Sequence, residues 1–249
     1  MSAPVLETRG LAKSFGGVQA VGGVDLSMPR GEIRALIGPN GAGKTTFFNM
    51  LTGQLKADAG EVRFKGERLS GLPPHLVWRR GVSRTFQITA TFLTLTSLEN
   101  VQVALQSHRR RTYALLARAR GLELEAAWAL LTQVGLEAQA ERPAGVLAYG
   151  DLKKLELAIA LANGPEVLLL DEPTAGMAPA ERGALMALTQ RIARERDLTV
   201  LFTEHDMDVV FSVADRVMVL HQGRVIAEGS PDEVRADVQV QKVYLGEAE

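Results

Sequence analysis

The sequence contains no cysteine, almost no net charge and no long apolar run. Without cysteine the chain can form neither disulfides nor a cysteine-ligated zinc site, an absence that suits a reducing compartment. The 28 basic and 29 acidic side chains leave a net charge of −1, whereas proteins that coat nucleic acid usually carry a basic excess. Residues 1–9 lack the pattern of a signal peptide. No apolar stretch approaches the roughly 20 residues of a membrane span, so a role in a membrane requires partner chains.

Strands and helices are predicted to alternate along much of the chain, whose 249 residues suffice for one large core or a core with a smaller lobe. Compact apolar runs predict strands over 33–37, 167–170 and 199–203. The helices expected to follow them cover 44–51, 179–196 and 206–214. This alternation predicts an α/β fold in which a parallel sheet is covered on both faces.

The middle of the chain, residues 97–162, has a different composition. Alanine, leucine and glutamate dominate, and apolar residues recur at helical spacing, as at Leu122, Ala126 and Leu130. We interpret this segment as an inserted helical lobe. Residues 1–96 and 163–249 are then expected to form the rest of one domain.

Residues 38–45 match the phosphate-loop pattern GxxxxGK(S/T), between a predicted strand and a predicted helix. Glycines let the backbone turn its N–H groups toward phosphate oxygens, and the helix N-terminus adds positive potential. Lys44 is expected to reach the β- and γ-phosphates, and the Thr45 hydroxyl to bind Mg²⁺. The residues expected to contact the nucleotide here are Gly38, Asn40, Gly41, Ala42, Gly43, Lys44, Thr45 and Thr46.

Two carboxylates, Asp171 and Glu172, follow the apolar strand over 167–170. They lie at the carboxyl end of a parallel strand, where ligands bind in α/β folds. We expect Asp171 to hold Mg²⁺, directly or through water, and Glu172 to act as general base or to orient the attacking water. Alone, the pair would suit a solvated strand end, but beside a phosphate loop it predicts a nucleotide hydrolase.

With these motifs in place, the whole chain resembles the ATPases of the ATP-binding cassette (ABC) family. Gln87, in the run TFQ, resembles the glutamine loop, which contacts Mg²⁺ or the lytic water and senses the membrane subunits. The segment LAYGD at 147–151 resembles the family signature, usually LSGGQ. His205 matches the switch histidine that contacts the γ-phosphate. Phe15 lies where the family has an aromatic residue that stacks on adenine, although a plain core role for Phe15 stays open.

The resemblance implies a P-loop NTPase (RecA-like) parallel-sheet core with an N-terminal antiparallel β subdomain and, at 97–162, an inserted α-helical subdomain. It also implies that ATP and Mg²⁺ are bound between two chains. Ala148, Tyr149 and Gly150 of one chain, at the start of a helix expected from Asp151 onward, would face the γ-phosphate held by the other.

The partners that the resemblance implies are transmembrane permease subunits, a second ATPase subunit in a homo- or heterodimer and, indirectly, an external solute-binding protein. The chain would then lie on the cytoplasmic face of the inner membrane as a peripheral subunit. No nucleic acid is expected as a partner. The segment 88–98, with Phe92, Leu93 and Leu95, would accept a short cytoplasmic helix of the permease.

Two residues depart from the family pattern, and one of these departures indicates which subfamily the chain resembles. Ala148 stands where the signature has serine, and Ala178 where the family usually has aspartate or asparagine. The run LAYGD followed by Lys153, Lys154 and Leu-Glu is similar to ATPases of branched-chain amino-acid importers. Urea, short-amide and lipopolysaccharide systems have similar sequences and stay open as alternatives.

The sequence lacks the distinguishing features of ABC ATPases that serve functions other than transport. Chromosome-type ABC ATPases insert long coiled coils, translation-type members carry two cassettes and repair members carry cysteine zinc sites, none of which this sequence has. A non-catalytic binding module is disfavoured by the presence of Lys44 and Glu172. The basic run Arg109 to Arg111, with Arg118 and Arg120, is either a solvated surface or a contact with anionic lipid headgroups or the permease.

Overall fold

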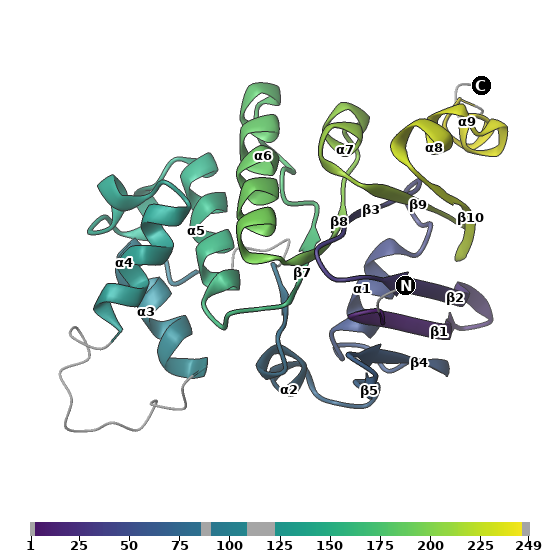
Figure 1. The fold of residues 1–249 in the computed structure, drawn as a ribbon, viewed down its shortest axis with the longest axis horizontal. Coiled ribbons are helices and arrows are strands. Elements are labelled where there is room, and N and C mark those ends of the chain that lie inside the picture. The colour runs from purple at the N-terminus through teal and green to yellow at the C-terminus, as the bar shows by residue number, and fades with distance from the viewer. Residues whose placement is uncertain (1–2, 86–90, 109–122, 246–249) are drawn as a thin grey trace.

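The computed structural model describes residues 3–85, 91–108 and 123–245, which form two sheets and a group of helices (Figure 1). The larger sheet has six strands in the order β10-β9-β3-β8-β7-β6. Its neighbours are parallel except β10, which pairs antiparallel with β9. The strands are β3 (Ile33–Ile37), β6 (Val82–Arg84), β7 (Val167–Asp171), β8 (Thr199–Thr203), β9 (Arg216–His221) and β10 (Arg224–Gly229).

The central strands of this sheet are buried on both faces. Every residue of β3, β7 and β8 is buried, as expected for parallel strands between two layers. Side chains that alternate along β7 belong to two separate cores: Leu168 and Leu170 face one, and Val167 and Leu169 face the other. The sheet therefore divides the hydrophobic interior of the molecule.

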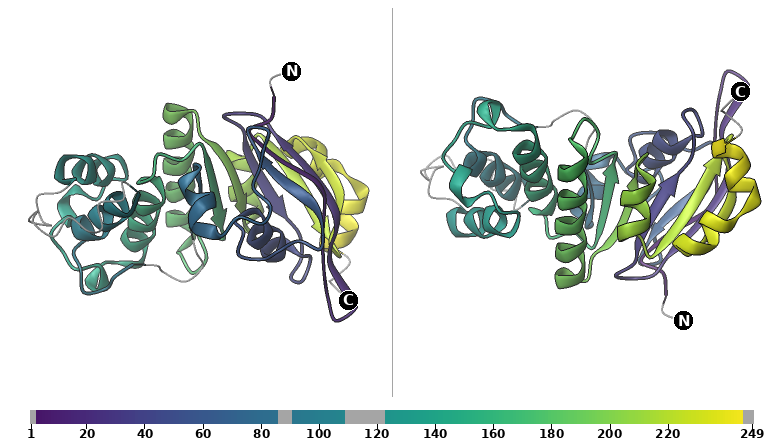
Figure 2. Two further views of the ribbon diagram at one scale, coloured as in Figure 1. Left: turned by 90° about the horizontal axis from the view of Figure 1, so that it is seen from below. Right: turned by 90° about the horizontal axis from the view of Figure 1, so that it is seen from above.

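One core contains most of the helices. It joins the sheet to α6 (Pro179–Arg196), α7 (Met207–Val213) and α8 (Pro231–Ala236), and it continues into α3 (Ser97–His108), α4 (Leu124–Gln133) and α5 (Tyr149–Leu161). The helices α3, α4 and α5 lie together at one end of the molecule, next to α6 (Figures 1 and 2). Helix α9 (Val238–Leu245) follows α8 near the C-terminus.

The other core lies between the large sheet and the N-terminal part of the chain. There, α1 (Lys44–Leu51) packs with an antiparallel sheet of order β2-β1-β4-β5. Its strands are β1 (Leu6–Phe15), β2 (Val18–Met28), β4 (Ala59–Phe64) and β5 (Glu67–Arg68), and the short helix α2 (Pro74–Arg79) follows them. The expected fold class, a parallel-sheet core with an antiparallel β part and inserted helices, is confirmed.

Several predicted elements have the expected bounds, and two helices begin elsewhere. The helices over 44–51 and 179–196 and the strand over 199–203 match the prediction. Helix α7 begins after Asp206, because the Asp206 carboxylate caps it by accepting hydrogen bonds from the N–H groups of Asp208 and Val209.

The start expected for the signature helix was wrong. Helix α5 begins at Tyr149 rather than at Asp151, because Ala148 is the extended N-cap residue and its carbonyl accepts a hydrogen bond from Leu152 N–H at 2.9 Å. Tyr149 and Gly150 thus belong to the first turn of the helix. Of the helices that the structure describes, none has the length and apolarity to cross a membrane.

Candidate functional site

The phosphate loop joins β3 to α1, and its backbone leaves no room for side chains at two glycines. Gly43, the N-cap residue of α1, has a φ of 106°, and a Cβ there would lie 2.2 Å from the Ala20 carbonyl oxygen. A Cβ on Gly38 would come within 2.1 Å of the Leu220 carbonyl oxygen. The turn between β9 and β10 also supports the loop, since Gly223 N–H donates to the Ala42 carbonyl at 2.9 Å. This tight cradle at a helix N-terminus has the build of an anion site.

Lys44 lies inside this cradle. Its ammonium donates to the carbonyl oxygens of Gly38 at 2.6 Å and Pro39 at 3.2 Å. Burial lowers the pKa of Lys44, while the nearby carboxylates of Glu172 and Asp171 oppose that shift. A desolvated ammonium in this position is a strong attractor for phosphate oxygens, so the cradle fits the phosphate groups of a nucleotide.

Asp171 ends β7 and is held from two sides. One carboxylate oxygen accepts a hydrogen bond from Arg84 Nη2 at 2.7 Å, and the other accepts one from the Thr203 hydroxyl at 2.9 Å. The Asp171 side chain is only 3% exposed. The side chain predicted to hold Mg²⁺ is therefore fixed in position by the two neighbouring strands β6 and β8.

Glu172 has an unusual backbone conformation. Its φ of 48° lies in the left-handed region, which costs a non-glycine residue on the order of 1–3 kcal/mol. The Glu172 N–H donates to the Thr203 hydroxyl at 3.0 Å, and the Glu172 carboxylate lies 2.8 Å from Nε2 of His205. The structure thus brings together the predicted catalytic carboxylate and the predicted switch histidine.

Three residues that motif analysis did not assign organise this site: Arg84, Thr203 and Glu204. Thr203 is bonded to both Asp171 and Glu172, as described above. The buried Glu204 accepts hydrogen bonds from the N–H (2.9 Å) and hydroxyl (2.6 Å) of Thr174 and from the His205 N–H (3.2 Å). The only sequence signal for these residues is their position next to recognised motifs, in the runs SRTFQ and TEHD.

The signature residues Ala148, Tyr149 and Gly150 lie elsewhere. Within the described ranges, no hydrogen bond or ion pair joins them to the phosphate loop. Instead, the Tyr149 hydroxyl donates to the Ala175 carbonyl at 2.9 Å, and the Tyr149 side chain is 45% exposed. Helix α5, which begins at Tyr149, lies on the opposite side of α6 from helix α1, which follows the phosphate loop (Figure 1). We call residues 148–150 the signature surface.

Phe15 and Gln87 are the other two residues expected to contact the nucleotide or its Mg²⁺. Phe15 lies beside the tight turn between β1 and β2 and is 49% exposed, with the Lys13 ammonium 5.5 Å from its ring centroid, so it is not part of the core. Stacking of Phe15 on adenine stays a prediction. Gln87 and the basic residues Arg109 to Arg111, Arg118 and Arg120 lie outside the described residues.

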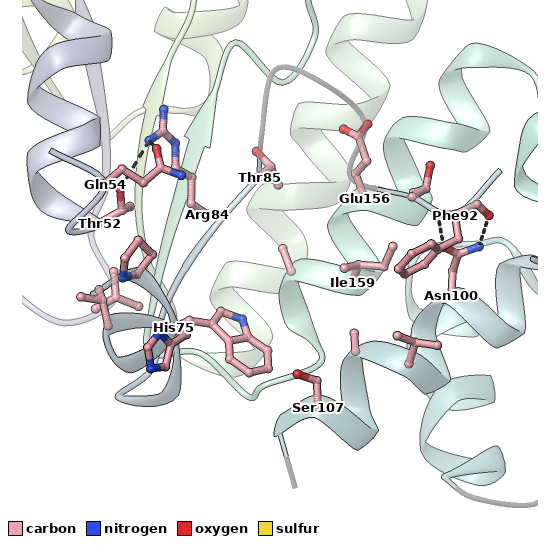
Figure 3. A pocket seen from close by; sticks show the side chains of 18 residues that line it. Thr52, Gln54, His75, Arg84, Thr85, Phe92, Asn100, Ser107, Glu156 and Ile159 are labelled. Carbon is pink, nitrogen blue, oxygen red and sulfur yellow. Dashed lines mark hydrogen bonds between the residues drawn. The ribbon is translucent and has the colours of Figure 1, made fainter. Parts of the chain in front are cut away.

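A groove of about 400 Å³ lies between the sheet core and the helical end of the molecule. Its wall is mostly apolar, and Phe92, which belongs to the segment expected to accept a permease helix, is 57% exposed at its rim. Figure 3 shows Arg84 and Gln54 toward one end of the groove and Phe92 with Asn100 toward the other. Its apolar wall includes Val77, Trp78, Phe92, Val103, Ala104 and Ile159.

Comparison with known proteins agrees with this geometry. Residues 21–175 match the ABC transporter family, and residues 224–249 match a family described as branched-chain amino acid ATP-binding cassette transporter. The chain is 42% identical to the high-affinity branched-chain amino acid transport ATP-binding protein BraF of Pseudomonas aeruginosa and 41% identical to LivG of Escherichia coli, in both cases over the full length of the two chains.

Solved structures of cassettes have the same fold. The ADP conformation of the ATP-binding cassette MJ1267 superposes with a TM-score of 0.87 at 31% identity, covering 98% of this chain and 100% of that one. A dimeric post-hydrolysis state of the cassette MJ0796, bound to ADP and Pi, gives a TM-score of 0.77 at 25% identity, over 91% of this chain and 98% of that one. The chain shares both sequence and fold with these proteins, and its phosphate loop meets Asp171, Glu172 and His205. This chain is therefore an ATPase of the ABC transporter family.

Proposed function

We propose that this ATPase drives a membrane importer whose substrate is a branched-chain amino acid or a related small polar solute. The observation that carries the ATPase part is the meeting of Lys44, Asp171, Glu172 and His205 at one edge of the sheet. The substrate class is supported by the full-length similarity to BraF and LivG and by the match over residues 224–249.

In this proposal, ATP binds with its phosphates in the cradle from Gly38 to Thr46, where Lys44 contacts the β- and γ-phosphates. Phe15 stacks on adenine. Mg²⁺ would be held by the Thr45 hydroxyl and Asp171, with Gln87 near it, and would neutralise charge on the phosphates. Among the described residues, no three or more histidine, cysteine, aspartate or glutamate side chains cluster as metal ligands. The proposed pair of one carboxylate and one hydroxyl suits Mg²⁺, which typically takes one or two carboxylates together with substrate phosphates.

Glu172 then acts as the general base that accepts a proton from the water attacking the γ-phosphate. Its left-handed backbone and its hydrogen bond to Thr203 fix where the carboxylate points. His205, 2.8 Å from that carboxylate, orients it and contacts the γ-phosphate. Positioning and charge stabilisation account for most of the catalysis of phosphoryl transfer, so these supports are central to the mechanism.

The working unit in this proposal is a pair of ATPase subunits, identical or related. Ala148, Tyr149 and Gly150 at the start of α5 would meet the γ-phosphate bound by the other subunit. Their separation from the phosphate loop of their own chain and the dimeric arrangement of a structural neighbour support this. Ala148 offers no side-chain donor, so the helix N-terminus would supply the contact.

The groove is proposed to receive a short cytoplasmic helix of a transmembrane permease subunit, so that the chain lies peripherally at the cytoplasmic face of the inner membrane. Residues 97–162 would move as a helical subdomain against the core formed by 1–96 and 163–249. An apolar groove with an exposed phenylalanine at its rim suits the apolar side of an amphipathic helix.

The test is affinity purification of the chain from its native membranes, followed by reconstitution with the permease that co-purifies. Leucine, isoleucine and valine, each with its binding protein, should stimulate ATP hydrolysis in the reconstituted complex. Stimulation by urea or a short amide, and by none of the three amino acids, would select a related small polar solute as the substrate, whereas stimulation by a lipopolysaccharide would overturn the substrate class. Co-purification with ribosomes or DNA and without a permease would overturn transport itself.

A further inference from the structure

Arg84, the last residue of β6, links three parts of the molecule through its side chain. Nη2 donates to Asp171 at 2.7 Å, and Nη1 donates to Asn49 at 2.7 Å. Nη1 also reaches Gln54 at 3.0 Å and the Thr52 hydroxyl at 3.4 Å. The guanidinium therefore ties the end of α1 to the carboxylate that ends β7.

This arrangement needs an arginine. Its side chain is 7% exposed and that of Asp171 is 3% exposed, and a buried ion pair is tolerated only when further hydrogen bonds satisfy both groups. The planar fork of a guanidinium offers donors in two directions at fixed angles, whereas a lysine ammonium is a single point of charge. Lysine at position 84 could neutralise Asp171, but it could not bridge Asp171 to Asn49 in the same geometry.

The same side chain also lines the groove. Arg84 lies there beside Thr52 and Gln54, and Figure 3 shows Arg84 bonded to Gln54 at one end of the groove. A helix seated in the groove would contact the residues that hold the guanidinium in place. A displacement of Arg84, or of Gln54 acting through its hydrogen bond with Arg84, would therefore change the hydrogen bond that holds Asp171.

We propose that Arg84 is a positioning residue, which fixes Asp171 for Mg²⁺ and transmits occupancy of the groove to that carboxylate. The first role concerns this chain alone. The second rests on the proposed function, because it requires that a permease helix occupies the groove. Groups that orient a metal ligand typically contribute about 10- to 100-fold to metal affinity, which sets the size of the expected effect.

The test of the first role is nucleotide binding by the isolated subunit, with and without Mg²⁺. Arg84→Met should reduce the gain in ATP affinity that Mg²⁺ confers by about 10-fold or more, while Mg²⁺-free ATP binding through the phosphate loop stays at the wild-type level. For Arg84→Lys, the gain in ATP affinity that Mg²⁺ confers should lie between the gains of wild type and Arg84→Met. Lysine retains the positive charge but cannot bridge Asp171 to Asn49. Arg80→Met, which removes an exposed arginine four residues earlier in the chain, is the matched control.

Mg²⁺-free binding also reports whether each variant is folded. A wild-type response to Mg²⁺ in Arg84→Met would overturn the positioning role, whatever occupies the groove. The second role is tested in the assembled transporter, where Arg84→Lys should lower the ratio of solute-stimulated to basal ATP hydrolysis several-fold. An unchanged ratio would overturn the link to the groove while leaving the ATPase and permease proposals untouched.

Discussion

The phosphate-loop edge and the signature surface of this chain are built in different ways. At the first, Lys44, Asp171 and Glu172 are each held by hydrogen bonds from the same chain, and Lys44 and Asp171 are buried. At the second, Ala148 and Tyr149 are exposed, and Tyr149 donates one hydrogen bond to a neighbouring turn. The comparison indicates that the phosphate-loop edge is preorganised by its own chain, whereas we propose that the signature surface is completed by a second subunit.

The largest expected effect comes from the phosphate-loop edge. Glu172→Gln should lower kcat by roughly 10²- to 10⁴-fold, the usual contribution of a general base, because an amide cannot accept the proton from water. ATP affinity should be retained, since it rests on the loop. The measurements are the hydrolysis rate, the affinity for ATP and the size of the ATP-bound species. The variant should accumulate as an ATP-bound dimer.

The control is Glu195→Gln, which changes an exposed glutamate on α6 and should behave as wild type. Wild-type hydrolysis in Glu172→Gln would remove Glu172 from catalysis.

At the same edge, Lys44→Met should change ATP affinity and the stability of the folded protein in opposite directions. Loss of a charged hydrogen-bonding group should weaken ATP binding by about 10- to 100-fold. The nucleotide-free protein should nevertheless melt at a higher temperature than wild type at pH 7, because burial disfavours the charged lysine and lowers its pKa.

The pH dependence of this stability difference has a definite sign. With a folded-state pKa below the ordinary value of 10.5, the unfolded wild-type chain binds more protons between the two values, so wild-type stability rises with pH in that window. The advantage of Lys44→Met should therefore shrink as the pH rises toward 10.5. Thermal melts across this range test it, and an advantage that grows with pH would contradict the stated burial penalty.

The features that could be predicted from the sequence are those determined by a short local pattern of residues. The bounds of α1, α6 and β8 follow from a glycine-lysine loop, a proline at the first helical position and an apolar run. The phosphate loop and the carboxylates at the end of β7 were predicted because each occurs in its expected local context. The roles of Gln87 and Phe15 stay predictions.

What could not be predicted depends on which strands are neighbours. The contacts of Asp171 with Arg84 and Thr203 exist because β7 lies between β6 and β8, an order that is not readable from spacing along the chain. The early start of α5 was missed because Ala148 caps the helix with its backbone alone, leaving no capping side chain to recognise.

The signature surface should respond to charge more than to size. Gly150→Asp places a carboxylate beside Glu181, whose Oε1 lies 3.5 Å from the position of a Cβ at residue 150. In the proposed dimer, the new negative charge would also face the γ-phosphate bound by the other subunit. We expect a loss of roughly 10-fold in ATP-dependent dimerisation and hydrolysis, from about 1–2 kcal/mol of repulsion. Gly150→Ala adds only an ordinary contact and Ala148→Ser adds a donor, so both should remain active. Equal activity in all three variants would show that this surface does not face nucleotide.

The smallest effect should come from the Tyr149 hydroxyl, and it tests how the two surfaces communicate within one chain. The Ala175 carbonyl accepts its hydrogen bond, and the Ala175 N–H donates to the Glu172 carbonyl at 3.1 Å. One residue of this turn is thus linked both to the signature helix and to the backbone of Glu172, the proposed general base. Tyr149→Phe removes one partly exposed hydrogen bond, worth about 0.5–1.5 kcal/mol, so kcat should fall a few-fold while ATP affinity of the isolated chain is unchanged.

Tyr149→Leu removes the ring as well, and with it the Lys153 ammonium contact at 5.5 Å from the ring centroid. If the hydroxyl carries the link, the two variants should lose similar activity. If the ring anchors the signature helix, only Tyr149→Leu should be impaired. Steady-state kinetics of both variants, with ATP binding measured on the same preparations, separates the two. Wild-type kcat in Tyr149→Phe would mean that the turn after Glu172 is positioned without the signature helix, so that the two surfaces are coupled only across the dimer.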